Sequence, residues 1–555
     1  MKKVNKFGVV LIVLTLMASL ALSACSKNTS EKTSESGGNS SKPAAEATDS
    51  PKSEKRDAGN GLMMPIADKV INLSLWAPSG GNFKGKDFND KFSFQKMEEN
   101  TGVHINFQHA TEASEEAFSL LMSSGKLPDM IYTSMWDKEA SKYGSKGALL
   151  PLEKLIEEKA PNIKKILEEN PDIRGLITSP DGHIYYLPNL MLDSRYLTQM
   201  FPQIRQDWLE KVGLPMPETT DDWYNVLKAF REKDPNNNGK ADEIPLVTVN
   251  LNNIMFLFAP AFGVDYEFFV ENGMVKYGPY DPRFKDVVEY LNKLYNEKLL
   301  DPNYLVDTTF KTLTEKVTTD VAGAWFGWAG SYMGNFTQLM EGKHPTFSIA
   351  PVLPPKGPNG DQRHVSFRWP AGPQGIAVSS QTKNADEIIQ WLDYQYSEEG
   401  ITLNNFGVEG KSYDIVDGQP KFKKEVTHPE NGVSNTEELL NHTVGGGSWA
   451  TVEDPRYSQQ IREASGQMDN PAELFGPYNN FDYKMPPLQL LPEENDIVVP
   501  IMADVTTYVT ETINAFIMGK KPISDYDKFI EQLKNMKFDL VLEQYQKAYD
   551  RFKGK

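Results

Sequence analysis

The chain contains 555 residues, with 76 acidic and 58 basic side chains and a formal net charge of −18 at pH 7. A surface this acidic makes nucleic acid a poor partner and disfavours non-specific binding to anionic lipid headgroups. The single cysteine, Cys25, excludes an intramolecular disulfide and a cysteine-based metal site. We therefore expect the chain to be stabilised by its core or by a metal, and to be long enough for two or more domains.

Residues 1–24 have the parts of a secretory signal peptide. A basic tip is followed by about eighteen uncharged residues, which is near the length of a membrane-spanning helix, the alternative interpretation. The sequence LSAC at residues 22–25 instead resembles the bacterial lipobox, in which the cysteine is acylated and becomes the mature N-terminus. Residues 25–61 are then expected to be the acylated Cys25 and a flexible linker rich in Ser, Lys, Glu, Gly and Pro.

The first folded segment alternates strand-like apolar runs with amphipathic helices. Strands are predicted at 70–77, 103–110 and 128–134, and helices at 92–102 and 114–126. Gly102 is expected to end the first of these helices, and Ser114 to cap the second. This alternation predicts a parallel α/β sheet. A turn into a short strand follows at 181–188.

A second α/β region begins near residue 204. Helices are predicted at 204–214, 219–234, 385–400 and from 504 to the end, and strands at 321–326 and 373–380. No second apolar run approaches the length needed to span a membrane.

The stretch DPNNNGKADE, residues 234–243, has the pattern of a calcium-binding loop. Side-chain oxygens at loop positions 1, 3, 5 and 9, a main-chain carbonyl at position 7 and the turn at Gly239 suit an ion that prefers oxygen ligands. Position 12 is Pro245 rather than Glu, so the loop is not a standard EF-hand, and Glu243 is the expected substitute carboxylate. The alternative is a solvent-exposed Asn/Gly turn. The expected ligands of a structural Ca²⁺ are Asp234, Asn236, Asn238, Lys240, Asp242 and Glu243.

Several motifs in a fixed order resemble one family. They are the lipobox and the stretches GKLPDMIY, KGALLPLEKLI, DGHIYYLP, RQDWLEKVGLPMPETTDDW, DPNNNGKADEIP, IAPVLPPKGPNG and FGVEGKSYDI, spread over most of the mature chain. Together they resemble the extracellular solute-binding lipoproteins of ABC sugar importers, the group that includes maltodextrin- and alginate-binding proteins. Alginate-binding relatives use a loop of the DPNNNGKADE pattern for structural calcium.

The resemblance implies an α/β, two-lobed periplasmic-binding-protein-like fold, with a hinge and a ligand cleft between the lobes. It also implies that the lobes interleave: residues 62–190 with about 366–430 form lobe 1, and about 191–365 with about 431–555 form lobe 2. The expected partners are an oligosaccharide, the transmembrane subunits of an ABC permease and the membrane, through a lipid anchor on the extracellular face of the bacterial cytoplasmic membrane. We expect a monomer.

A sugar site needs flat aromatic faces together with amide and carboxylate groups in a cleft. Trp208, Trp223 and Trp391 lie on predicted amphipathic helices and Trp325 on a predicted buried strand, which indicates core positions. Other aromatic residues lie at strand ends or in loops, where α/β sheets bind ligands. The candidate ligand contacts are Trp76, Tyr132, Trp136, Trp328, Arg368 and Trp369, with Trp328 at a position that resembles a sugar-stacking tryptophan of maltodextrin-binding relatives. For each tryptophan, packing is the alternative role, and for Arg368 it is a structural ion pair.

Two rival functions share parts of this pattern. A receptor for a peptide or another non-sugar solute would have the same fold and differ only in its cleft lining. A secreted carbohydrate-active enzyme would need a close pair of carboxylates, which the count of acidic residues does not exclude and no spacing nominates. No G-x-S-x-G nucleophile motif and no histidine metal pattern are present, so we expect no enzyme.

Overall fold

The computed structural model describes residues 55–78, 87–110, 115–193, 197–198, 200–306, 309–365, 368–430, 435–444, 449–464, 471–479 and 483–554. The predicted signal peptide, the acylated Cys25 and most of the predicted linker lie outside the described residues. Within the described part of the chain, no helix is both long enough and apolar enough to cross a membrane.

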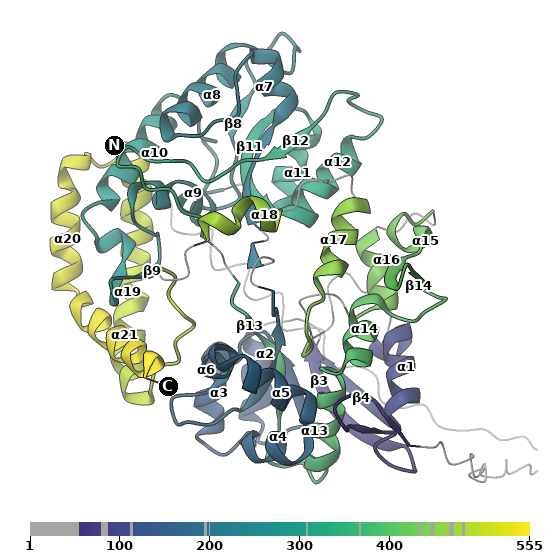
Figure 1. Ribbon diagram of the computed structural model, residues 1–555. Coiled ribbons are helices and arrows are strands. Elements are labelled where there is room, and N and C mark those ends of the chain that lie inside the picture. Colours follow the sequence, from purple (N-terminus) through teal and green to yellow (C-terminus); the bar gives the residue numbers. More distant parts are fainter. Residues whose placement is uncertain are drawn as a thin grey trace, which may run out of the picture. The chain divides into compact units, whose positions relative to one another are not determined.

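The first of two larger sheets has five strands in the order β4-β3-β5-β13-β6 (Figure 1). Their bounds are β3 Ile71–Pro78, β4 Val103–Ala110, β5 Met130–Thr133, β6 Tyr186–Leu190 and β13 Ala371–Val378. β3 runs parallel to β4 and β5, which confirms the predicted parallel arrangement of these three strands. β13 is antiparallel to both β5 and β6, so the complete sheet is mixed. The sequence between Tyr186 and Val378 gave no sign of this reversal, because strand direction depends on the route of the connection.

The second sheet has four strands in the order β12-β7-β11-β8. Their bounds are β7 Met200–Arg205, β8 Ile244–Leu246, β11 Ala322–Trp328 and β12 Ile349–Pro351. β11 is antiparallel to β7 and parallel to β8. Three two-stranded ribbons complete the strands of the described residues: β1 Arg56–Asp57 with β2 Met63–Met64, β9 Phe268–Glu271 with β10 Met274–Tyr277, and β14 Tyr413–Val416 with β15 Gln419–Phe422.

Helices surround both sheets. Those that precede β7 or follow β13 up to residue 464 are α1 Phe92–Thr101, α2 Glu115–Ser123, α3 Trp136–Gly144, α4 Glu153–Lys159, α5 Pro161–Glu169, α6 Pro171–Ile177, α13 Ala385–Tyr394, α14 Glu398–Phe406, α15 Lys424–Thr427, α16 Asn435–His442 and α17 Pro455–Ala464. The others are α7 Gln206–Val212, α8 Thr220–Glu232, α9 Leu251–Phe258, α10 Phe284–Asn296, α11 Phe310–Thr318, α12 Asn335–Met340, α18 Pro471–Phe475, α19 Pro492–Ile517, α20 Tyr526–Asn535 and α21 Phe538–Lys553.

Local signals explain most helix ends. Gly102 adopts φ 72° and ends α1 as predicted. Thr219 accepts from the main-chain N–H of Asp222 and forms a capping box at the start of α8. The predicted helix at 385–400 is instead two helices, because Ser397 caps a new start. The predicted helix at 204–214 begins only at Gln206, since residues 204 and 205 belong to β7.

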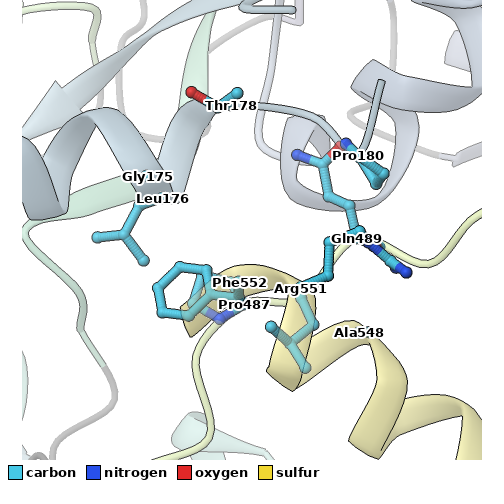
Figure 2. Close-up of a pocket in the computed structure, with 10 residues that line it drawn as sticks. Gly175, Leu176, Thr178, Pro180, Pro487, Gln489, Ala548, Arg551 and Phe552 are labelled. Carbon is cyan, nitrogen blue, oxygen red and sulfur yellow. The ribbon is translucent and has the colours of Figure 1, made fainter. Parts of the chain in front are cut away.

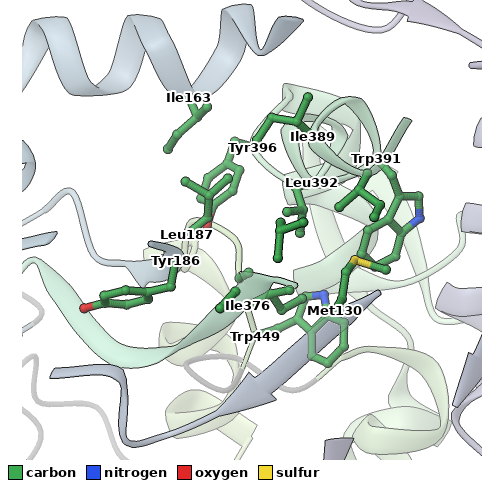
Figure 3. Close-up of a cluster of buried hydrophobic side chains, with 14 of the residues drawn as sticks. Met130, Ile163, Tyr186, Leu187, Ile376, Ile389, Trp391, Leu392, Tyr396 and Trp449 are labelled. Carbon is green, nitrogen blue, oxygen red and sulfur yellow. The ribbon is translucent and has the colours of Figure 1, made fainter. Parts of the chain in front are cut away.

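Each large sheet has its own hydrophobic core. The first core contains buried residues from 58–190 and 371–452, and the second contains buried residues from 204–352 and 498–541. Figure 3 shows part of the first core, where Met130, Leu187 and Ile376 of the sheet lie near Ile389 and Leu392 of α13. The first core reaches Val452, past the predicted lobe crossover near residue 430.

The chain passes between the two cores three times: between Leu190 and Met200, between Val352 and Ala371, and after Val452. Two of these crossings are joined where the N–H of Met191 donates to the carbonyl of Pro370 (2.8 Å). The third lies beside the first, because the N–H of Glu453 donates to the carbonyl of Leu190 (2.7 Å). Crossings that lie side by side form a narrow connection, which is the structural requirement for a hinge.

Residues 55–64 are packed onto the first core, although they fall mostly within the predicted flexible linker. Leu62 and Met64 are buried, and Asp57 accepts from the N–H groups of Gly59 and Gly61. Arg56 forms a bidentate ion pair with Glu399, with one contact of 2.7 Å. We refer to residues 55–64 as the N-terminal clamp. The prediction of a flexible chain up to residue 61 is therefore wrong for its last seven residues.

Buried Asp393 holds the start of α5, and Asn162 of that helix contacts the clamp. Its carboxylate accepts from the main-chain N–H of Asn162 (3.2 Å), from the Asn162 side chain (2.8 Å) and from the N–H of Ile163 (2.8 Å), which caps the helix. Asn162 also accepts from Asn60 of the clamp (2.8 Å). Burial raises the pKa of Asp393 to about 6 and outweighs these hydrogen bonds, which favour the charged form.

The Asp393 carboxyl should make folding stability depend on pH. Its pKa is higher in the folded chain than its ordinary value, so the folded state binds the proton more tightly and gains stability as pH falls from 7 to 5. Relative to Asp393→Asn, the natural chain should gain about 1 kcal/mol of unfolding free energy as the pH falls from 7 to 5. Chemical denaturation of both proteins at each pH measures it. A difference that stays constant with pH would contradict the expectation.

Candidate binding site at the strand ends

The ends of strands from both sheets meet the crossing segments. β5 and β6 end, and β13 begins, at one edge of the first sheet, where Ala371 pairs with Leu190. In the second sheet β11 ends at Trp328, which pairs with Met200 at the start of β7. Because residues 191–199 connect Leu190 to Met200, both edges adjoin the same crossing. Aromatic side chains at these edges therefore lie where a ligand could contact both cores.

Two predicted contacts present partly exposed rings at these edges. Tyr132, near the end of β5, stacks on buried Trp449 with centroids 5.1 Å apart. Trp328 is half-buried at the end of β11, and its carbonyl accepts from Gln203 Nε2 (3.1 Å). The Gln203 amide also accepts from the indole of buried Trp325 (2.7 Å), so this strand end is held by hydrogen bonds as well as packing.

The structure places Trp76 and Trp136 in the first core. Trp136 has no exposed surface, and its indole N–H donates to the carbonyl of Gly375 (3.0 Å). Trp76 is 8% exposed and packs on Phe118. Both therefore serve the packing role that the sequence analysis weighed as the alternative, and Trp136 presents no face to a ligand in this structure. Trp136 opens helix α3 rather than a loop, because residues 136–144 turn an apolar face to the sheet.

Arg368 and Trp369 belong to the second crossing. Arg368 pairs with Glu453, whose side chain is 3% exposed, at 2.7 Å. Lys484 donates to the carbonyl of Arg368, and its ammonium lies 4.4 Å from the centre of the Trp369 ring. Burial lowers the pKa of Lys484 to about 7. The ion pair expected as the alternative for Arg368 is thus present.

Three carboxyl groups near these rings were not predicted. Asp137 follows Trp136 in the first turn of α3, and Asp265 and Glu267 flank Tyr266 just before β9. Burial raises the pKa of each of the three, to about 6 for Asp265, although Glu267 is an exposed side chain. No sequence signal separates these residues from the other acidic side chains.

The predicted calcium loop folds around its acidic side chains. Asp234 accepts from the N–H groups of Asn238 (3.1 Å) and Gly239 (3.0 Å), and Gly239 makes the turn with φ 74°. The amides of Asn236 and Asn238 both donate to Asp242. Asn236 also donates to the carbonyl of Asp320 (3.0 Å). The loop thus gathers carboxylate, amide and main-chain oxygens, the donor types that calcium prefers.

Glu243 provides a test of whether the loop fits a cation. Its side chain is 2% exposed, and neither carboxylate oxygen has a hydrogen-bond partner. A buried carboxylate without a partner is costly unless a cation compensates it. Among the described residues, no three His, Cys, Asp or Glu side chains are gathered as a metal cage. Amide and main-chain oxygens of the loop would have to complete the shell, as the sequence predicts.

A separate notch lies between α6 and α21 (Figure 2). It encloses about 290 Å³ including its open mouth, and Leu176 faces Phe552 across it. Its charged residue, Arg551, is already paired with Glu494 (2.7 and 2.9 Å). Beside the notch the Ser179 hydroxyl donates to Gln489 (2.9 Å). The notch is therefore a contact between the two halves of the fold rather than a candidate for the main ligand.

Comparison with known families agrees with this arrangement of two cores and shared strand ends. The family model of bacterial extracellular solute-binding proteins matches residues 80–402. The chain belongs to this family. Its relatives include the fructooligosaccharide ABC transporter substrate-binding protein FusA of Streptococcus pneumoniae serotype 4, at 30% identity over 513 residues, which cover 89% of this chain and 93% of FusA.

Solved structures of other solute-binding proteins share the fold. The alginate-binding protein AlgQ2 without calcium ion matches with a TM-score of 0.71 and 28% identity, covering 87% of this chain and 99% of AlgQ2. FusA in complex with kestose matches with a TM-score of 0.71 and 28% identity, covering 87% of this chain and all of FusA. FusA has also been solved as an EF-hand mutant in complex with fructo-nystose. This solute-binding protein therefore has the two-lobed α/β fold with a hinge and a cleft between the lobes.

Proposed function

We propose that this solute-binding protein is the membrane-anchored substrate-binding component of an ABC importer. It captures an oligosaccharide outside the cell and delivers it to the permease. The observation that carries the proposal is that partly exposed aromatic residues of both sheets, Tyr132 and Trp328, lie near strand ends that adjoin the crossings, and that the second crossing holds Trp369. Aromatic faces stack on sugar rings, and the likeness to FusA over most of both chains supports a sugar rather than a peptide.

The mechanism is hinge closure without covalent chemistry. A ligand that contacts Tyr132 on one core and Trp328 on the other stabilises the closed arrangement over the open one. The crossings at Met191 and Pro370 are joined by a hydrogen bond and would bend together. The permease would then recognise the closed form, while an acylated Cys25 holds the protein at the extracellular face of the membrane.

A structural calcium ion in the 234–243 loop is part of the same proposal. The residues that would hold it are Asp234, Asn236, Asn238, Asp242 and Glu243 through their side chains and Lys240 through its carbonyl. Support comes from the unpartnered buried carboxylate of Glu243 and from the calcium-related structures of AlgQ2 and FusA. Bound calcium would supply positive charge that fixes the end of α8 to the start of β8.

Replacing Trp328 with alanine tests the ligand site. Loss of one stacking face should weaken oligosaccharide binding by about ten- to a hundredfold, since burying an aromatic side chain contributes about 1.5–3 kcal/mol. Isothermal titration calorimetry with kestose and other trisaccharides measures the change.

Tyr224→Ala is the matched control, because Tyr224 is also half-buried but lies on α8, where it donates to Glu297. If Trp328→Ala binds as well as Tyr224→Ala, the strand-end site is wrong. Steady cleavage of the bound glycan would favour the enzyme alternative instead.

A further inference from the structure

Two cations described near the candidate site, Arg368 and Lys484, are already engaged by the protein. Arg368 is paired with Glu453 at 2.7 Å, and the Ser458 hydroxyl donates to the same carboxylate (3.0 Å). Lys484 donates to the carbonyl of Arg368 and lies over the Trp369 ring. Neither side chain is available to pair with a ligand without first leaving its present partner.

Arg363, in the second crossing, is enclosed. Its guanidinium stacks 4.1 Å from the centre of the Tyr483 ring, and its three nitrogens are buried without hydrogen-bond partners. An incoming carboxylate could not reach these nitrogens in this structure. Its charge instead acts on Asp265 and lowers the pKa of that carboxyl, which burial raises. The protein therefore already uses the charge of Arg363 to offset an acid at the site.

The carboxyl groups near the site, unlike these cations, are not held in ion pairs within the described residues. Asp137, Asp265 and Glu267 are exposed or partly exposed, and no ion pair of any of them is found among the described residues. The ribbon that follows Glu267 lies along the third crossing, because the N–H of Val270 donates to the carbonyl of Tyr483 (2.9 Å). This contact places the segment of Asp265 and Glu267 near Lys484, which lies over the Trp369 ring.

Lys138 is an exposed cation that follows Asp137 directly. Its charge lowers the pKa of both Asp137 and Glu267, against the raising effect of burial. The charge of Lys138 thus acts on two carboxyls. Among the described residues Asp137, Asp265, Glu267 and Lys138, the acids outnumber the base.

We propose that the oligosaccharide is neutral, and that Asp137, Asp265 and Glu267 recognise its hydroxyl groups. This inference rests on the proposed function. Carboxylates accept charge-assisted hydrogen bonds from hydroxyls, whereas a uronic acid or sulfate placed beside them would meet like charge, and among the described residues only Lys138 is an exposed cation known to act on two of these acids. Likeness of fold does not distinguish a neutral from an acidic sugar, since the similar proteins include both an alginate-binding protein and a fructooligosaccharide-binding protein. The charges of the described residues favour the neutral sugar.

Calorimetry with two ligand panels tests the inference. Neutral trisaccharides, with kestose as the first probe, should include a ligand that binds at least tenfold more tightly than any acidic trisaccharide of the alginate or galacturonan type. Binding of the neutral sugar should change less than about twofold between about 50 and 500 mM NaCl, because no ion pair is formed. Preference for an acidic sugar, weakened by salt, would overturn the inference and leave the proposed function intact. Failure of both panels would contradict the proposed function itself.

Two carboxyl variants test the residues. Asp265→Asn and Glu267→Gln keep the shape of each side chain but replace a charged acceptor with a neutral one, so affinity for the neutral sugar should fall about tenfold. Asp286→Asn is the control, because Asp286 is exposed on α10. Melting temperatures of all three verify that they fold. If both site variants bind like the control, these acids do not recognise the ligand.

Discussion

Replacing Arg205 with alanine is expected to lower the free energy of unfolding by about 3–5 kcal/mol. Arg205 has no exposed surface, and its Nε and Nη2 donate to Asp207 at 2.8 and 2.7 Å. Its Nη1 donates to Asp320 at 2.5 Å. The guanidinium also lies between the rings of Trp208 (4.7 Å) and Phe347 (4.5 Å). The substitution would remove this packing and leave two carboxylates without their cation.

Arg456 is a matched control for Arg205. It also pairs with an aspartate two residues away, Asp454, but its side chain is 44% exposed. Arg456→Ala should therefore cost no more than about 1 kcal/mol. Arg205→Lys should lower the free energy of unfolding by an amount between these two, since lysine keeps the positive charge but lacks the planar guanidinium group. Urea denaturation of the variants measures the series. Equal effects of the two alanine substitutions would show that burial of Arg205 does not matter.

Removing calcium is expected to produce the second large effect. If free calcium exceeds its dissociation constant about a thousandfold, bound calcium adds about 4 kcal/mol to the unfolding free energy. Chelation should remove this contribution and lower the melting temperature. Differential scanning calorimetry with and without a chelator measures it. An unchanged melting temperature would identify the 234–243 loop as an ordinary Asn/Gly turn.

The effect of Glu243→Gln on stability should have opposite signs without and with calcium. Without calcium the variant should be more stable than the natural chain by about 1–3 kcal/mol, because an unpartnered buried carboxylate is gone. With calcium it should be the less stable of the two, because one charged ligand is missing. Glu232→Gln is the control, since Glu232 is an exposed side chain at the end of α8. This control should leave the free energy of unfolding unchanged both without and with calcium.

Sequence reasoning succeeded where the signal is local. The bounds of β4, the end of α1 at Gly102 and the turn at Gly239 all depend on residues a few positions apart. It failed where partners are distant in the chain. Arg368 and Glu453 are 85 positions apart, so the sequence offers an ion pair only as one possibility for Arg368. Trp136 follows a strand closely, as a ligand contact might, but tertiary packing buried it against Gly375.

The acidic residues of the candidate site illustrate the same limit. Glu267 is distant in the chain from Asp137 and Lys138, and only the folded arrangement lets the charge of Lys138 act on it. The aromatic candidates were easier to select, because tryptophan is scarce in this chain and its position relative to strand ends can be counted. Acidic residues are abundant, so counting them does not distinguish Asp137, Asp265 and Glu267 as ligand contacts.

The N-terminal clamp has a mechanical consequence. Any pulling force carried by the chain that precedes Lys55 enters the folded protein through Arg56 and Asn60. Their partners, Glu399 and Asn162, lie on helices that flank the first sheet, so the load is spread within one half of the molecule. None of it needs to pass through the segment around Met191 and Pro370. Tension on the N-terminal chain would therefore leave the connection between the two halves free to bend.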